Sequence, residues 1–334
     1  MDNLCHSLVG AAMSGAGLRR RTALATVTMV IGANLPDVDV LVYLVGDNAD
    51  GLAFRRGWTH GVLAMCVLPF VLTAIMYAVG RAIERRRSRA NRPGLRIPLR
   101  ATQLLVVSAL SIWSHPLFDL MNTYGVRLLM PFSGRWFYGD ALFIVDPWVW
   151  SALGFGATMS IQRARRVPVG AGTATVMARA SRPARVALIA VAAYVAVMAA
   201  TSQLGRIVAE RQAVAQGLGP SSRVMAAPEP LTPFRRTVVR DLGASYETGT
   251  LTWSVTPRYA ASGERVTALV DTTAQYRLAV STRAGRHFLV WSRFPFYEEV
   301  PAGGATATRL DDVRYGGPGR RSFASVTIPV TPTQ

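Results

Sequence analysis

Long apolar runs separated by short polar gaps dominate residues 1–204 of the chain. Most of these runs reach the length of about 20 residues that a helix needs to cross a bilayer. A shorter apolar run, residues 4–17, is rich in glycine, alanine and serine, which let helices pack closely. The pattern predicts an α-helical polytopic membrane bundle of about five to six helices. The predicted spans are residues 22–46, 59–80, 101–122, 142–162 and 184–204.

The apolar pattern changes beyond the last span. Residues 205–217 continue as a short helical extension, and Pro, Ser and Ala then accumulate up to residue 233. After that point apolar and polar residues alternate, as in LTWSVT (251–256), and residues 276–292 indicate two strands around an Ala-Gly turn. We therefore expect a membrane-embedded domain at 1–204, a linker at 205–233 and a small C-terminal all-β domain at 234–334.

The placement of the arginines indicates whether this basic chain is suited to a lipid bilayer or to a nucleic acid. The formal net charge is +18, there is no lysine, and the arginines cluster in the short gaps between apolar runs. That distribution is typical of a membrane protein in its lipid bilayer, and we expect no nucleic-acid partner. The arginine-rich gaps at 19–21, 81–100 and 163–183 predict the cytoplasmic side. The C-terminal domain is then expected outside the cytoplasm.

The start of the chain has a second interpretation, a secretory signal peptide with Arg19–Arg21 as its charged region. A small-residue cleavage site should then follow closely. The chain instead continues into Asn34-Leu35-Pro36-Asp37, which favours a retained helix.

Ionisable residues inside apolar spans are costly and usually mark functional sites. At about 1.5 Å per helical residue, those in four separate segments lie about 20–31 Å from the nearest arginine-rich gap. In a hydrocarbon core about 30 Å thick, they share the outer half of the membrane. His287 lies outside the spans, in the predicted β domain, where we expect it at the surface. The residues inside the spans are His6, Asp37, Asp39, His60, His115 and Asp119.

These side chains are suited to binding a divalent metal. His115 and Asp119 are four residues apart, hence on one helical face, and Pro36 interrupts a helix beside Asp37 and Asp39. Imidazole and carboxylate groups bind Zn²⁺, Mn²⁺ or Fe²⁺, with Zn²⁺ favoured here. A metal held with open positions activates water, so hydrolysis is the expected reaction. Because one ion cannot use six protein ligands and stay open, either two ions bind or some acids act as base. Asp39 and Asp119 are the predicted catalytic residues.

Two other functions use the same features. A single histidine on an apolar helix is more often a hydrogen-bond partner than a ligand, and intramembrane Asp and His also form proton or cation pathways in transporters. The helices could alternatively serve as an anchor for a β domain that binds another protein, whose identity the sequence does not define.

Several motifs in order resemble one family. His6-x₃-Gly10, Asn34–Asp39 (NLPDVD), Arg56–Gly61 (RGWTHG) and Ser114–Asp119 (SHPLFD) are similar to the YdjM-like predicted membrane-bound metal-dependent hydrolases of bacteria. The resemblance continues to Trp148 and covers roughly the first half of the chain. It implies a multi-pass protein of the bacterial inner membrane whose His and Asp residues bind metal. A more distant likeness to zinc-dependent bacterial phospholipase C implies phosphoester chemistry. Because a site in the outer half of the membrane opens most easily to lipids, we expect a lipid or lipid-linked (phospho)ester as substrate.

The segment between the third and fourth spans contains candidate substrate-binding residues. The guanidinium groups of Arg127 and Arg135 match an anionic headgroup in geometry and charge. Asp140 is the third predicted substrate-binding residue.

Overall fold

The computed structural model describes residues 1–166, 174–302 and 305–329, and these form two compact units. The first unit comprises Met1–Val38 and Arg56–Met198, and the second comprises Asp39–Arg55 and Ala199–Gln334. The predicted fold class, a helical bundle with a C-terminal β domain, is confirmed. One grouping was not evident from the sequence, because residues 39–55, which begin inside the predicted span 22–46, belong with the C-terminal part.

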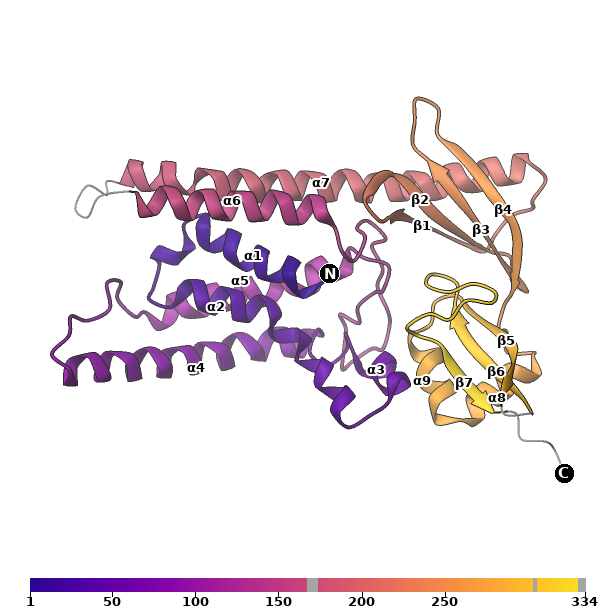
Figure 1. Ribbon diagram of the computed structural model, residues 1–334, viewed down its shortest axis with the longest axis horizontal. Coiled ribbons are helices and arrows are strands. Elements are labelled where there is room, and N and C mark those ends of the chain that lie inside the picture. Colours follow the sequence, from indigo (N-terminus) through magenta and orange to yellow (C-terminus); the bar gives the residue numbers. More distant parts are fainter. Residues whose placement is uncertain (167–173, 303–304, 330–334) are drawn as a thin grey trace. The chain divides into compact units, whose positions relative to one another are not determined.

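The first unit is a bundle of helices (Figure 1). Helix α1 packs against α2 and α6, and α5 packs against α2 and α4. At Gly10, any side chain would meet the backbone of Met29, so α1 and α2 approach as closely as the small residues predicted. The helices of this unit are α1 (Asn3–Gly15), η1 (Leu18–Arg20), α2 (Ala25–Asn34), η2 (Leu35–Leu44, shared with the second unit), α4 (Val62–Arg89), α5 (Ala101–Leu120), α6 (Pro147–Arg165) and α7 (Ala174–Ala215, also shared).

Four helical segments in the described part of the chain are long and apolar enough to cross a membrane. They are Ala25–Leu44, Val62–Arg89, Ala101–Leu120 and Thr175–Ala215. Helix α4 carries apolar side chains on its surface, and Phe70 and Ile75 are more than half exposed. An apolar surface of this kind needs lipid or protein to cover it.

The NLPDVD segment breaks its helix as predicted. α2 ends at Asn34, whose side-chain amide donates to the carbonyl of Val30 (2.8 Å). Pro36 has no N–H for a helical hydrogen bond, and the chain continues as the 3₁₀ helix η2.

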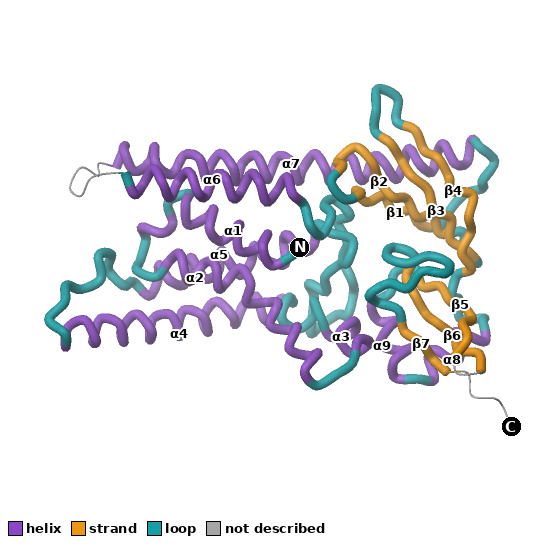
Figure 2. Tube along the Cα trace, in the orientation of Figure 1, coloured by secondary structure: helices purple, strands orange, loops and turns teal. Residues whose placement is uncertain are grey.

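The second unit contains two antiparallel sheets, shown as orange strands in Figure 2. In the first, Val238 packs with Ala209 and Ala213 of α7, whereas Val239 faces the core around Phe294 and Phe296. Successive residues of one strand therefore bury opposite faces, as the period of two requires. The strands are β1 (Arg223–Glu229), β2 (Thr232–Asp241), β3 (Ser245–Thr252) and β4 (Arg258–Thr267) in one sheet, and β5 (Pro295–Ala302), β6 (Ala305–Asp312) and β7 (Val326–Pro329) in the other.

The two strands predicted within residues 276–292 are wrong. The structure has α8 (Ala274–Ser281) and α9 (Arg283–Trp291) there. The hydroxyls of Thr273 and Thr282 cap these helices by accepting from backbone N–H groups three residues later. Phe288 and Trp291 are both fully buried and three residues apart, which is a helical spacing rather than a strand spacing.

The segment 205–233, predicted as a linker, contains regular structure. α7 extends to Ala215, and β1 begins at Arg223. The segment 39–55 contributes the short helix α3 (Asn48–Phe54), which packs against α9 within the second unit.

Candidate metal centre

Four of the predicted ligands converge in the interior of the bundle. Asp37 of η2, His60 of the turn before α4, and His115 and Asp119 of α5 each offer one atom, and these atoms lie within 4.8 Å of one another. Asp37 is 7% exposed and the other three are fully buried. Residues from three separate stretches of sequence thus meet at one buried point.

The separations between these atoms match those of a metal's ligands. His60 Nε2 lies 3.1 Å from His115 Nε2, and Asp119 Oδ2 lies 3.4 and 3.5 Å from these two nitrogens. Asp37 Oδ1 lies 3.9 Å from His60 Nε2 and 3.7 Å from His115 Nε2. Bonds of about 2.0–2.1 Å in a tetrahedral zinc site place neighbouring ligand atoms about 3.3 Å apart. The four side chains therefore fit one divalent ion of this kind.

Hydrogen bonds outside the group orient both imidazoles. His115 Nδ1 donates to the carbonyl of Ala33 (2.7 Å), which leaves the lone pair of Nε2 facing the other ligand atoms. His60 Nδ1 pairs with the hydroxyl of Thr59 (2.9 Å), and its Nε2 also faces the group. Metal-binding histidines are usually fixed in this way by a partner on the second nitrogen.

His6 lies against the group of four rather than within it. Its ring stacks on that of His115 with centroids 3.7 Å apart, and its Nε2 lies 3.3 Å from Asp119 Oδ1. The amino group of Met1 also contacts Asp119 Oδ1. Among the described residues, His6 Nε2 and Asp119 Oδ2 are buried atoms that form no hydrogen bond. Buried polar atoms usually have a hydrogen-bond partner, so these two atoms distinguish the centre from an ordinary buried polar cluster.

The sequence analysis did not identify Arg56 and Asn122 as residues of the centre. Arg56 is buried, its Nε lies 3.1 Å from Asp119 Oδ2, and its Nη1 donates to Asn122 Oδ1 (3.0 Å). Asn122 Oδ1 also accepts from the N–H of Tyr124 (2.8 Å). The sequence did contain a signal for both residues, because Arg56 begins the motif RGWTHG and Asn122 begins the motif NTYG, which closely follows SHPLFD.

The backbone around Arg56 explains part of the RGWTHG motif. Arg56 has φ 52°, in the left-handed region that few non-glycine residues adopt. A Cβ at Gly57 would lie 2.5 Å from the guanidinium of Arg127, so only glycine fits there without displacing it. The motif therefore holds Arg56, Arg127 and His60 in place around one tight turn.

Asp39 is not in the group of four. Its Oδ1 accepts from Nε of Arg55 at 3.3 Å, and both residues belong to the second unit. The predicted roles of Asp39 as ligand and catalytic residue stay predictions.

The three predicted substrate-binding residues occupy different environments. Arg127 is buried with its guanidinium 4.9 Å from the ring of Trp136, whereas Arg135 is exposed over Phe137. Asp140 is fully buried and has φ 50°. Asp146, beyond this segment, caps α6 by accepting from the N–H groups of Trp148 and Val149.

The fold and the centre together define a helical membrane protein with a buried His/Asp group suited to a divalent cation. The chain belongs to the family described as YdjM inner membrane protein, whose model matches residues 1–204. The match confirms the resemblance found in the motifs, and it covers the whole of the bundle's predicted domain.

The chain is also similar to a curated protein described as "Uncharacterized protein YfhP" of Bacillus subtilis (strain 168), with 24% identity over 157 residues. The match covers 45% of this chain and 43% of the relative, so it spans less than half the length of either protein. No solved structure matches the chain.

Proposed function

We propose that the protein is an integral membrane metal-dependent hydrolase that acts on a lipid or lipid-linked (phospho)ester. The observation that supports this proposal most is the convergence of Asp37, His60, His115 and Asp119 at one buried point with ligand-like separations. In this proposal these four residues hold the metal, and Zn²⁺ suits them best. The bound ion would polarise the scissile ester and lower the pKa of a water molecule.

The charges near the centre favour an anionic substrate. Asp37 and Asp119 contribute two negative charges, and Arg56 and the amino group of Met1 contribute two positive charges. A divalent cation would therefore leave the group with a net positive charge, which attracts a phosphate or carboxylate ester. Arg56 also orients Asp119, and the planar guanidinium of Arg127 would bind an anionic headgroup.

His6 is the candidate proton acceptor in the proposed reaction. Its Nε2 faces Asp119 and has no hydrogen bond among the described residues, so it is able to take a proton from water. The stacked ring of His115 fixes its orientation.

A lipid substrate is supported by an apolar cavity on α5, the helix that carries His115 and Asp119. A cavity of about 250 Å³ lies between α5 and α7, and its lining is apolar. Leu117 and Phe118, which directly precede Asp119 in sequence, form one wall, and Leu188 and Val191 form part of the other. Such a cavity suits an acyl chain. With the arginine-rich gaps in the cytoplasm, the centre would face the outer leaflet and the C-terminal domain would lie outside the cytoplasm.

The proposal is tested with purified protein in vesicles that contain phospholipid labelled in the headgroup. We expect release of a water-soluble labelled product without any ion gradient, loss of release after chelation, and recovery when Zn²⁺ is added. Asp119→Asn should lose release, whereas Glu84→Gln, which removes an acid that pairs with Arg81 at the far end of α4, should retain it.

The same vesicles distinguish the alternative function, a proton- or cation-coupled transporter. Solute movement that follows an imposed gradient and survives chelation, with no release of labelled product, would contradict the hydrolase proposal.

A further inference from the structure

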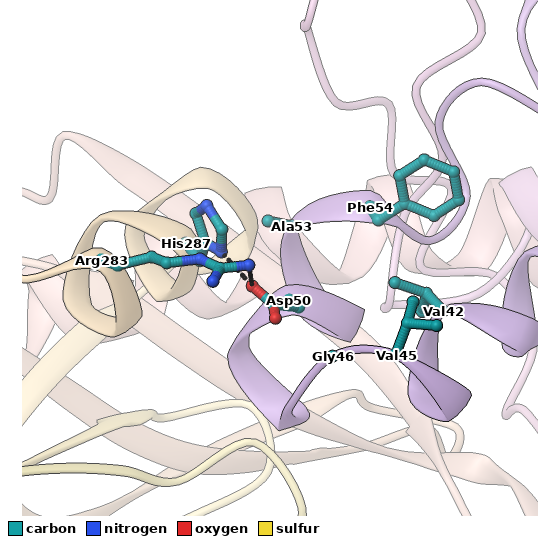
Figure 3. Close-up of a pocket in the computed structure, with 8 residues that line it drawn as sticks. All are labelled: Val42, Val45, Gly46, Asp50, Ala53, Phe54, Arg283 and His287. Atoms are coloured by element: carbon teal, nitrogen blue, oxygen red, sulfur yellow. Dashed lines mark hydrogen bonds and ion pairs between the residues drawn. The ribbon is translucent and has the colours of Figure 1, made fainter.

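A cleft in the second unit contains a second aspartate–histidine cluster. Its volume is about 290 Å³, and its polar residues are Asp50 of α3 with Arg283 and His287 of α9. We call these three residues the Asp50 cluster. Figure 3 shows both α9 side chains directed toward Asp50. The cluster joins a segment between two predicted spans to the C-terminal domain, all within one compact unit.

Every carboxylate oxygen of Asp50 has a donor. Oδ1 accepts from Arg283 Nη2 (2.7 Å) and His287 Nδ1 (2.8 Å), and Oδ2 accepts from the N–H of Asp47 (3.1 Å). Burial opposes ionisation of Asp50, but the Asp47 hydrogen bond and the charge of Arg283 lower its pKa overall. A further hydrogen bond runs from Asn48 Nδ2 to the carbonyl of Phe323 (2.8 Å). The C-terminal domain thus holds α3 by charged and neutral hydrogen bonds.

Helix α3 is also packed tightly against η2. A Cβ at Gly51 would lie 2.2 Å from the ring of Tyr43, and a Cβ at Gly46 would lie 2.6 Å from Asp50 Oδ2. Val42 and Phe54 line the same cleft from the two elements. A shift of α3 would therefore displace the 3₁₀ helix that follows NLPDVD, because close-packed contacts transmit displacement.

Both ends of the segment 39–55 lead into the metal centre. Asp39 and Arg55 form an ion pair (Nε–Oδ1 3.3 Å) that ties the two ends together. Asp37, two residues before this pair, is one of the four converging residues. Arg56, directly after it, contacts Asp119.

We infer that the C-terminal domain positions the metal centre through the segment 39–55. The Asp50 cluster holds α3, α3 holds η2, and the Asp39–Arg55 pair fixes the separation of the two ends that present Asp37 and Arg56. Asp39, Asp50, Arg283 and His287 are then positioning residues, which gives the C-terminal domain a role in the activity. This inference rests on the proposed function, because it assigns a purpose to the same centre.

The first test measures hydrogen exchange of the backbone amides in residues 39–55 of the full-length protein in detergent. Arg283→Ala/His287→Ala removes two donors of Asp50 that stand at least partly exposed, so the fold should tolerate it. We expect exchange in this segment to rise about tenfold or more, because hydrogen bonds to charged groups are the stronger ones. Arg286→Ala is the matched control, since Arg286 is an exposed α9 residue whose side chain donates only to the carbonyl of Val280 among the contacts described.

The second test measures the Zn²⁺ dissociation constant of the same proteins. The double variant should bind Zn²⁺ about 10-fold to 100-fold more weakly, the effect typical of losing a group that orients metal ligands. Arg283→Lys, which keeps the charge, should recover part of the affinity.

The outcomes separate the two proposals. Unchanged exchange in the double variant would overturn the inference, and so would increased exchange with unchanged Zn²⁺ affinity. A wild-type protein that binds no Zn²⁺ would refute the proposed function and the positioning role together, whereas the exchange difference would still show that the cluster holds the segment.

Discussion

Two clusters of aspartate and histidine in this molecule differ in how donors and acceptors meet. In the Asp50 cluster, Arg283 and His287 each direct an N–H at the carboxylate, within 2.7–2.8 Å. In the metal centre, two histidine Nε2 atoms face one another at 3.1 Å and share a carboxylate oxygen at 3.4–3.5 Å. In the Asp50 cluster each acceptor is matched by a donor, whereas in the metal centre several acceptor atoms are directed at a common point.

The difference teaches how to separate a structural cluster from a binding site in one chain. A complete set of hydrogen bonds stabilises the fold and needs no ligand. Converging lone pairs in a buried space are unfavourable unless a cation joins them. The comparison therefore predicts that substitutions in the centre act directly on metal binding, whereas substitutions around Asp50 act on it only through the position of the segment 39–55.

Arg56→Gln should give the largest effect. It leaves the buried Asp119 carboxylate without its guanidinium partner, and loss of one member of a buried ion pair costs about 3–5 kcal/mol. We expect a markedly lower thermal unfolding midpoint in the metal-free protein, and a larger rise on adding Zn²⁺ than the wild type shows, because a bound ion stabilises the folded state.

Arg81→Gln is the control for this substitution, since Arg81 is exposed and pairs with Glu84 rather than Asp119. A midpoint of Arg56→Gln that Zn²⁺ leaves unchanged would contradict the assignment of the centre.

Gly51→Ala should have a smaller effect that metal does not reverse. The new Cβ would lie 2.2 Å from the Tyr43 ring, and overpacking of this kind costs about 1–3 kcal/mol. The double variant Gly51→Ala/Tyr43→Ala removes the clash and should recover most of the loss, which a thermodynamic cycle measures. Equal midpoints for the wild type and Gly51→Ala would show that α3 and η2 do not pack as described.

Substitution of Asp312 should give the smallest effect, and the pH dependence of that effect should be limited to acid. Burial raises its pKa, but the charge of Arg314 and hydrogen bonds from Arg314, Ser292 and Phe294 more than compensate, so its pKa falls to about 2. Because the unfolded value is 3.8, the unfolded chain binds the proton more tightly. The stabilisation is therefore complete above about pH 4 and is lost as the pH falls toward 2, an effect of about 2 kcal/mol.

The measurement compares the unfolding free energy of the wild type and Asp312→Asn between pH 2 and 5. The advantage of the wild type should shrink as the pH falls. A constant difference across that range would contradict the role of the ionised carboxylate.

The predictable parts of the fold were those set by local pattern. Long apolar runs gave the helices, and Pro36 gave the break after Asn34, because each depends on residues close in sequence. The strands predicted at 276–292 failed because the alternation there was ambiguous, while the helix caps Thr273 and Thr282 were overlooked. Val255 shows the same limit, since it continued an alternating pattern but lies beyond β3 and is fully exposed.

The candidate site was predictable to the extent that membrane burial makes a residue unusual. His60, His115, Asp37 and Asp119 stood out as charged or polar residues within or beside apolar runs, and the structure brings them together. Arg56 did not stand out, because the sequence places it in a polar gap, whereas in the structure it is buried and has a left-handed backbone conformation. The sequence does not show which aspartates bind metal and which position other residues, because these roles depend on contacts between residues far apart in sequence.

Metal analysis of purified protein tests the central claim most directly. After equilibration with limiting Zn²⁺ and removal of the free ion, we expect the wild type and Glu84→Gln to retain bound zinc, because Glu84 lies in an exposed pair with Arg81. His60→Ala and His115→Ala should retain little or none, since each removes one of the four converging atoms. Equal zinc content in all four proteins, or none in any, would contradict the metal centre.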